Sequence, residues 1–270
     1  MTNDTPAKAS WWGDFDFACG QSKQWSIGRL TFIVQRLKNE WLIAYERADD
    51  YENNGINWRV IDTDLSAESL TDRSRYVFQG TGGLLRITPK LADRPIISRP
   101  LTPFNLTAGE EVTLYVSSSL WLEIAIVSAQ QTITLKEIAI QRPSDTWFGP
   151  STLEGELCYA STSHCRLNLE ELPHRPHRAI TPVHISNRAD TTLTLERLNL
   201  PAPLLTLYTS ASGQLWTPQI TLTREKDGDI AELKIDNTPP EDAQAISQLS
   251  PPRNNTDSNV LFRAFNAIFS

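Results

Sequence analysis

Apolar and polar residues alternate with a period of two along residues 111–141, the most regular stretch of the chain. Successive side chains of a β-strand point to opposite faces, so this period predicts strands with one buried and one solvated face. Breaks at Ser117–Ser119 and Ser128–Gln130 divide the stretch into three strands, which we expect to pair as an antiparallel meander. The apolar positions of these strands are Val112, Leu114, Val116, Leu122, Ile124, Ile126, Ile133 and Leu135.

Shorter runs of the same kind occur on both sides of this stretch and predict an all-β protein. Before it, Gly80–Gly83 is typical of a hairpin loop between two strands. After a turn-rich connection over residues 142–150, short strands alternate with turn signals at about the 8–12-residue spacing of immunoglobulin-like sandwiches. We therefore expect a flexible arm over residues 1–10 and two β-sandwich-like units, the second partly immunoglobulin-like, over residues 11–142 and 143–236.

The last part of the chain changes composition twice. Residues 237–257 contain four prolines among polar and acidic residues, which predicts a linker. Residues 258–270 are apolar again, and a period of about 3.6 residues gathers their apolar side chains on one side. We therefore predict a short C-terminal amphipathic helix. Its partner-binding face would consist of Leu261, Phe262, Phe265, Ile268 and Phe269.

Composition and charge narrow the classes of partner. The chain has 270 residues and a net charge of -7, so no overall basic field would attract nucleic acid or anionic lipid. The N-terminus lacks the apolar core of a signal peptide, and no apolar run is long enough to span a membrane. These features lead us to expect a cytoplasmic protein, with peripheral membrane contact only through a membrane-protein partner.

Cysteine and histidine residues gather in one region and raise the question of a zinc site. Cys158, Cys165 and all four histidines lie between residues 158 and 184, and thiolate and imidazole are zinc ligands. No CxxC pair occurs, however, and neighbouring His164 and Cys165 would point to opposite faces of a strand. Three cysteines without paired spacing indicate reduced thiols and no metal or other cofactor. A zinc-binding protein that uses this region remains an alternative.

Tryptophan is abundant, and five of the eight tryptophans lie in the first sixty residues near several aspartates. Aromatic rings beside carboxylates can form a sugar-binding platform or a glycosidase cleft. Large aromatic side chains of β-rich proteins more often fill the core. We expect core packing here and keep a carbohydrate-binding module as the second alternative.

No sequence signature of a common enzyme class is present. The glycines at 80–83 precede a strand rather than a helix, so they do not match a phosphate-binding loop, and GxSxG, HExxH and Walker sequences are absent. The sequence therefore favours a non-enzymatic interaction or regulatory module without catalytic residues. It would dock a protein partner, or a second copy of itself, through the C-terminal helix.

Several phrases of the sequence together resemble an uncharacterised family of bacterial and archaeal proteins, a domain of unknown function. They are Asp93-Arg94-Pro95 with Arg99-Pro100, Tyr115-Val116-Ser117 with Leu120-Trp121-Leu122, Thr146-Trp147-Phe148-Gly149, Gly155–Ala160, and Leu204–Tyr208 with Leu215-Trp216-Thr217. The resemblance covers residues 12–235 and implies no established activity and no catalytic residues. Some members are encoded beside small mechanosensitive channels, which implies that a membrane channel is one candidate partner.

Overall fold

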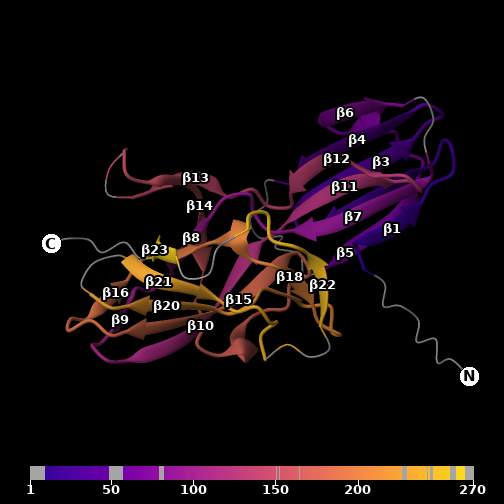
Figure 1. Cartoon of the computed structure of the whole chain (residues 1–270). Coiled ribbons are helices and arrows are strands. Elements are labelled where there is room, and N and C mark those ends of the chain that lie inside the picture. Colours follow the sequence, from indigo (N-terminus) through magenta and orange to yellow (C-terminus); the bar gives the residue numbers. More distant parts are fainter. Residues whose placement is uncertain are drawn as a thin grey trace, which may run out of the picture. The chain divides into compact units, whose positions relative to one another are not determined.

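The computed structural model describes residues 10–48, 57–78, 82–149, 151, 153–163, 165–226, 230–241, 243, 246–255 and 260–264. These residues form twenty-three strands and three short 3-10 helices, so the all-β prediction is confirmed (Figure 1). No helix among them is long and apolar enough to cross a membrane.

The chain divides into two compact units, and neither is a continuous segment. Unit 1 consists of residues 1–89 and 122–140, and unit 2 consists of residues 90–121 and 141–270. This differs from the division expected from sequence, because residues 90–121 belong with the C-terminal part of the chain. The chain therefore passes from one unit to the other three times.

Unit 1 contains two sheets, and their central strands β3 and β11 each include three consecutive buried residues. The five-stranded sheet has the order β5-β2-β3-β4-β6. The four-stranded sheet has the order β1-β7-β11-β12. The strands are β1 (Gly13–Asp16), β2 (Ser22–Ile27), β3 (Leu30–Arg36), β4 (Glu40–Arg47), β5 (Trp58–Thr63), β6 (Asp72–Val77), β7 (Leu84–Lys90), β11 (Trp121–Val127) and β12 (Thr132–Ala139), with the 3-10 turn η1 at Ala67–Ser69.

Aromatic side chains from both sheets form the core of unit 1. Trp25 of β2 stacks on Phe32 of β3, with ring centroids 4.9 Å apart. Phe15 of the other sheet meets the same indole edge-on at 5.1 Å. Trp11 and Trp41 are also fully buried. Three of the five early tryptophans are thus core residues, as expected.

Unit 2 contains an eight-stranded sheet, a four-stranded sheet and a two-stranded sheet. In the largest, the order is β22-β18-β19-β15-β20-β21-β23, with β10 paired to β15. The orders of the others are β13-β14-β8-β17 and β16-β9. The strands are β8 (Ile96–Pro100), β9 (Phe104–Leu106), β10 (Glu111–Ser119), β13 (Ser144–Phe148), β14 (Glu156–Ser163), β15 (Arg178–Asn187), β16 (Leu193–Leu195), β17 (Leu198–Leu200), β18 (Leu207–Thr209), β19 (Leu215–Trp216), β20 (Ile220–Arg224), β21 (Ile230–Ile235), β22 (Ser247–Ser250) and β23 (Val260–Arg263), with 3-10 turns η2 at Leu169–Glu171 and η3 at Ala202–Leu204.

The large sheet is mixed rather than purely antiparallel. β15 pairs with β19 and β20 in parallel and with β10 in the antiparallel direction. An immunoglobulin-like sandwich consists of antiparallel sheets, so this arrangement does not support the expected immunoglobulin-like unit.

The three strands of the central stretch occur at the predicted positions, but they do not form a meander. β11 and β12 are neighbours in unit 1, whereas β10 pairs with β15 in unit 2. Only Leu120 separates β10 from β11, and the common tight hairpins need at least two loop residues. The serines at 117–119 are part of β10 rather than a turn, and the hydroxyls of Ser117 and Ser119 accept hydrogen bonds from Arg178.

The C-terminal helix prediction is wrong for the residues that the structure describes. Residues 260–263 form β23, which pairs antiparallel with β21 of the same chain. Backbone pairing with an available sheet edge outweighs the helical apolar pattern of so short a segment. The expected linker also contains a strand, β22, which pairs with β18.

Another expected hairpin is absent. β6 and β7 flank the glycines at 80–83, but they belong to different sheets of unit 1. The glycine-rich loop therefore connects the two sheets instead of closing a hairpin.

Candidate functional site

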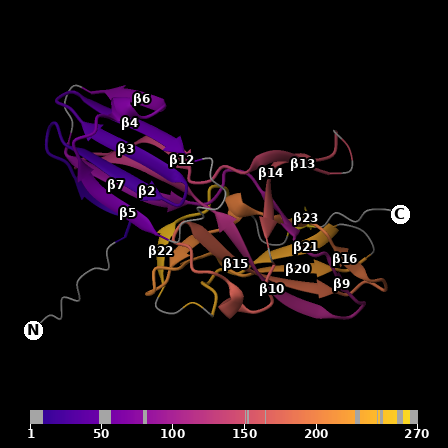
Figure 2. The same cartoon turned by 180° about the vertical axis from the view of Figure 1, so that it is seen from behind.

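The hairpin of β13 and β14 in unit 2 has one buried face and one exposed apolar face. On the inner face, Phe148 and Cys158 join Ile97 of β8 in a buried cluster. On the outer face, Trp147 lies directly opposite Leu157. These two side chains are 43% and 45% exposed. The loop end of the hairpin extends beyond the other strands of unit 2 in both views (Figures 1 and 2).

The loop at the end of this hairpin holds the indole of Trp147 in place. The indole Nε1 of Trp147 donates a hydrogen bond of 2.8 Å to the carbonyl of Ser151. A Cβ atom on Gly155 would lie 2.6 Å from that nitrogen, so only glycine leaves room for the ring. The hydroxyl oxygen of Ser151 accepts hydrogen bonds from the backbone N–H groups of Leu153 and Glu154. The resulting turn presents Leu153 with 94% of its surface exposed.

The same outer face continues from the apolar pair into a charged network around Tyr159. Tyr159 lies opposite Asp145, two residues along each strand from the apolar pair. The buried phenol donates a 2.9 Å hydrogen bond to Asp93. The guanidinium groups of Arg94 and Arg142 lie 5.4 and 5.6 Å from the centroid of its ring.

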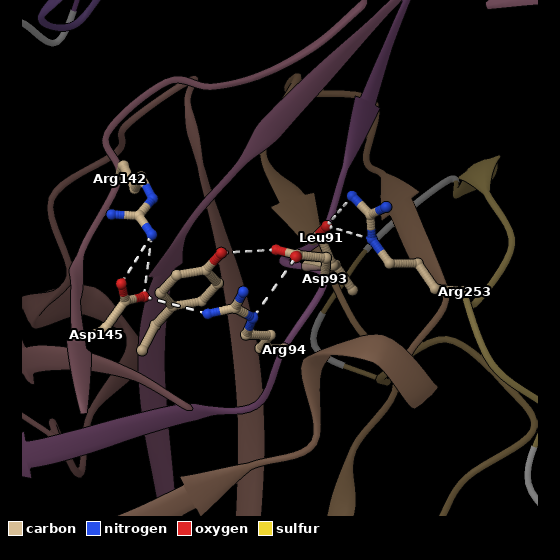
Figure 3. A network of polar contacts seen from close by, with 7 residues as sticks. Leu91, Asp93, Arg94, Arg142, Asp145 and Arg253 are labelled. Carbon is tan, nitrogen blue, oxygen red and sulfur yellow. Dashed lines mark hydrogen bonds and ion pairs between the residues drawn. The ribbon is translucent and has the colours of Figure 1, made fainter. Parts of the chain in front are cut away.

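Asp145 connects the two arginines. Its carboxylate accepts hydrogen bonds from Arg142 at 3.0 Å and from Arg94 at 3.3 Å, as Figure 3 shows. Arg94 also lies within 3.9 Å of Asp93. Each of these charged side chains is between 35% and 49% exposed, so the ion pairs contribute modestly to stability. Their geometry nevertheless fixes the charges beside the apolar pair.

The protonation states in this network favour binding over acid-base chemistry. Burial, together with the hydrogen bond to Asp93, raises the pKa of Tyr159, so the phenol stays protonated at neutral pH. The hydrogen bond to Asp145 raises the pKa of Arg142. The cluster therefore consists of two fixed cations, two carboxylates and a neutral phenol, which suits recognition of polar groups at the rim of an interface.

A third arginine holds the C-terminal part of the chain against this region. Nε and Nη2 of Arg253 donate hydrogen bonds of 2.9 and 2.7 Å to the carbonyl of Leu91 (Figure 3). Leu91 and Arg142 each lie within two residues of a point where the chain enters unit 2. These hydrogen bonds thus also anchor the chain at the two points where it enters unit 2, near residues 90 and 141.

The residues that the sequence assigned to partner binding lie elsewhere. Leu261 and Phe262 are part of β23. Phe265, Ile268 and Phe269 lie outside the described residues. The role of these five residues in binding a partner stays a prediction.

Among the described residues between Cys158 and His184, no three side chains form a group that could hold a metal ion. His164 lies outside the described residues. Cys158 is fully buried, and burial raises the pKa of its thiol to about 12. Burial also raises the pKa of Cys165. A thiolate, the form that binds metals and attacks electrophiles, is therefore disfavoured at both positions.

These environments predict the reactivity of the three free thiols. Cys19 is exposed, whereas Cys158 and Cys165 are buried. We expect one thiol to react rapidly with Ellman's reagent in the native protein at neutral pH, and the other two to react only after unfolding. A Cys19→Ser variant should lack the rapid phase. Equal reaction rates for all three thiols would contradict the burial described here.

β13 lies within residues 142–150, for which the sequence predicts a turn-rich connection rather than a strand. A signal was present. Thr146 and Phe148 alternate with Asp145 and Trp147 between the chain-breaking Pro143 and Gly149. This is the period of a short strand, but the run is only five residues long.

Three of the phrases that carry the family resemblance lie in this part of unit 2. Asp93-Arg94-Pro95 leads into β8, while Thr146–Gly149 and Gly155–Ala160 form most of the hairpin. The backbone N–H of Tyr159 donates a 2.9 Å hydrogen bond to the carbonyl of Pro95 and so joins two of them directly.

Comparison with known proteins gives a family but no characterised relative. No curated protein and no solved structure matches the chain. A family model described as "Protein of unknown function (DUF432)" matches residues 11–269. Because this match covers almost the whole sequence, the chain belongs to the DUF432 family of proteins of unknown function.

Proposed function

We propose that this protein is a non-enzymatic interaction module that docks a partner protein through the outer face of the β13–β14 hairpin. The observation that carries the proposal is the cross-strand pair of Trp147 and Leu157, each more than two-fifths exposed, with Leu153 almost fully exposed at the loop end. Contiguous exposed apolar side chains on a projecting element are typical of interaction sites.

The geometry of this face suits a binding hot spot. Tryptophan and arginine are the residue types most enriched in such spots. The hydrogen bond to Ser151 and the contact with Gly155 already fix the indole of Trp147. Less side-chain entropy is therefore lost when a partner covers this ring. Arg94, Arg142 and the two aspartates would form a polar rim beside the apolar centre.

The C-terminal segment is a second proposed contact. Ala264, the last described residue, accepts a hydrogen bond from the backbone N–H of Asn199 in β17, so this residue lies beside the same four-stranded sheet. Docking by Phe265, Ile268 and Phe269 would add apolar area to an interface on that sheet. A membrane channel remains one candidate partner on the ground of the family resemblance.

The test compares two double variants of this protein. The quantity compared is the amount of cross-linked complex that each variant forms with a partner in native cells. Trp147→Ser with Leu157→Ser removes the proposed docking pair. Leu101→Ser with Leu167→Ser removes two leucines of the same unit that are 57% and 62% exposed. We expect the first variant to lose at least about 90% of a defined cross-linked complex, because hot-spot residues carry most of the binding energy.

The control variant should retain that complex, and both variants should melt within a few degrees of the wild type. Equal loss in both variants, or undiminished complex in the first, would refute docking through the hairpin. A variant that lacks residues 265–270 tests the second contact separately.

Two alternative functions remain open to direct measurement. A carbohydrate-binding module would bind neutral sugars in a glycan screen, and its platform would need tryptophans other than the buried Trp11, Trp25 and Trp41. A zinc protein would contain stoichiometric zinc by elemental analysis. The zinc alternative does not account for the exposed apolar face of the hairpin, and in the carbohydrate alternative the exposed Trp147 would be the platform.

A further inference from the structure

A cavity of about 580 Å³ lies in unit 2, where β19 pairs with the beginning of β15. Its volume is within the range of about 300–1,000 Å³ that is typical of small-molecule sites. Trp216, its neighbour Ile180 and Gln214 line it, and each is more than nine-tenths buried. Leu169 and Leu172 line it as half-buried residues. None of the described lining residues belongs to the β13–β14 hairpin, so this cavity is separate from the proposed docking face.

The lining of this cavity favours an uncharged ligand. Its described residues include no lysine, arginine, aspartate or glutamate, and His174 is exposed. Six of these ten residues are apolar. Because a charged group loses more hydration than a neutral one when it enters such a site, a neutral molecule with an apolar body fits best.

Two polar groups in this lining have no hydrogen-bond partner within the described part of the chain. The indole Nε1 of Trp216 is a buried donor without an acceptor. The side-chain nitrogen of Gln214 donates hydrogen bonds of 3.2 and 3.4 Å to the carbonyls of Leu215 and Arg178. Its Oε1 accepts none from the described residues. Buried polar groups without partners lower stability and are rare, so a ligand that pairs with both groups would stabilise this region.

We propose that this cavity binds an uncharged small molecule that combines an apolar body with a carboxamide-like edge. The acceptor of that edge would take the hydrogen bond from Trp216, and its donor would supply one to Oε1 of Gln214. The body would lie against the leucine and isoleucine side chains. A site with buried polar groups discriminates strongly against molecules that lack the complementary groups. This inference goes beyond the proposed docking function and does not depend on it.

Isothermal titration calorimetry of the full chain with three related probes tests the ligand class. The probe 2-naphthamide has an apolar ring system and both amide groups, N,N-dimethyl-2-naphthamide lacks the donor, and 2-naphthoate carries a charge in place of the amide. We expect saturable binding of 2-naphthamide with a Kd below about 1 mM, which is reasonable for a ligand of this size. Each of the other two probes should bind at least about fivefold more weakly.

Two pairs of variants locate the binding site. Trp216→Phe removes the indole donor but keeps an aromatic ring, whereas Trp58→Phe makes the same change in β5 of unit 1. Leu172→Trp fills part of the cavity, whereas Leu101→Trp makes the same change at a leucine outside the described lining that is 57% exposed. We expect both cavity variants to bind 2-naphthamide at least about fivefold more weakly, and both controls to bind it like the wild type.

A spectroscopic readout separates direct contact from an indirect effect of these substitutions. A proton–nitrogen correlation spectrum gives one indole N–H signal for each of the eight tryptophans, and the signal that Trp216→Phe lacks belongs to Trp216. This signal should move downfield as 2-naphthamide is added, because the indole gains an acceptor. If Trp216→Phe does not fold, the three probes and the leucine variants still test the proposal.

Equal affinities for 2-naphthamide and 2-naphthoate, undiminished binding by Leu172→Trp, or an unshifted Trp216 signal would each overturn the proposal. No saturable binding of 2-naphthamide up to about 1 mM would overturn it as well. None of these results bears on docking through the hairpin, which the cross-linking experiment tests.

Discussion

Replacing Ile124 with aspartate is expected to abolish folding of unit 1. Ile124 lies in β11, between β7 and β12, and its side chain is fully buried. Ile126 is also buried, as predicted, but so is Ala125 between them, so this strand is covered on both faces. Burial of an unpaired carboxylate costs several kcal/mol, and a domain has a total stability of only about 5–15 kcal/mol. The variant should therefore lack a cooperative thermal transition for unit 1.

Two further variants separate the buried charge from milder effects. Ile124→Val keeps the side chain apolar and should cost about 1 kcal/mol. Thr134→Asp introduces the same charge at an exposed position of the neighbouring strand β12 and should change stability by less than about 0.5 kcal/mol. The measurement is thermal unfolding followed by near-ultraviolet circular dichroism. A cooperative transition of Ile124→Asp close to that of Thr134→Asp would refute the position of Ile124 in the core.

Mild acid is expected to destabilise unit 2 through His177. This side chain is 3% exposed, and its Nδ1 has no hydrogen-bond partner among the described residues. Burial, with smaller contributions from Arg178 and Arg175, lowers the pKa of His177 from 6.5 to about 4. The neutral ring is therefore favoured in the folded state. The unfolded chain binds an extra proton between these two pH values, so stability falls as the pH decreases.

The expected loss is about 3 kcal/mol between pH 6.5 and pH 4. It should appear as a lower midpoint of urea unfolding, followed by tryptophan fluorescence. His177→Leu cannot be protonated and should lose this part of the pH dependence. His174→Leu, an exposed neighbour, should keep the wild-type profile. The same pH dependence in wild type and His177→Leu would show that another group is responsible.

The sequence predicted strands more reliably than their partners. β10, β11 and β12 lie where the period of two places them, because alternation depends only on which side chains are buried. The pairing partner of β10 is β15, which begins 59 residues after the end of β10. No local pattern determines such a long-range contact, so the meander and the boundary between the units were predicted incorrectly.

The candidate site was less predictable than the fold. Trp147 and Leu157 are apolar, and their types alone suggest burial. Their exposure follows from the pairing of β13 with β14 and from the use of the opposite face by Phe148 and Cys158. The C-terminal residues illustrate the reverse case. Residues 260–263 have a helical apolar pattern, but β21 offers an edge with which they can pair.

The interrupted course of unit 1 has a consequence during synthesis on the ribosome. Its four-stranded sheet needs β11 and β12, but the first segment of the unit ends at residue 89 and the second at residue 140. At 5–20 residues per second, the ribosome needs roughly 3–10 s to add the intervening 51 residues. During that interval the nascent chain holds an incomplete sheet and an uncovered aromatic core. The growing chain is thus a substrate for chaperones that bind apolar surfaces, and its yield in a cell should depend on translation speed across residues 90–140.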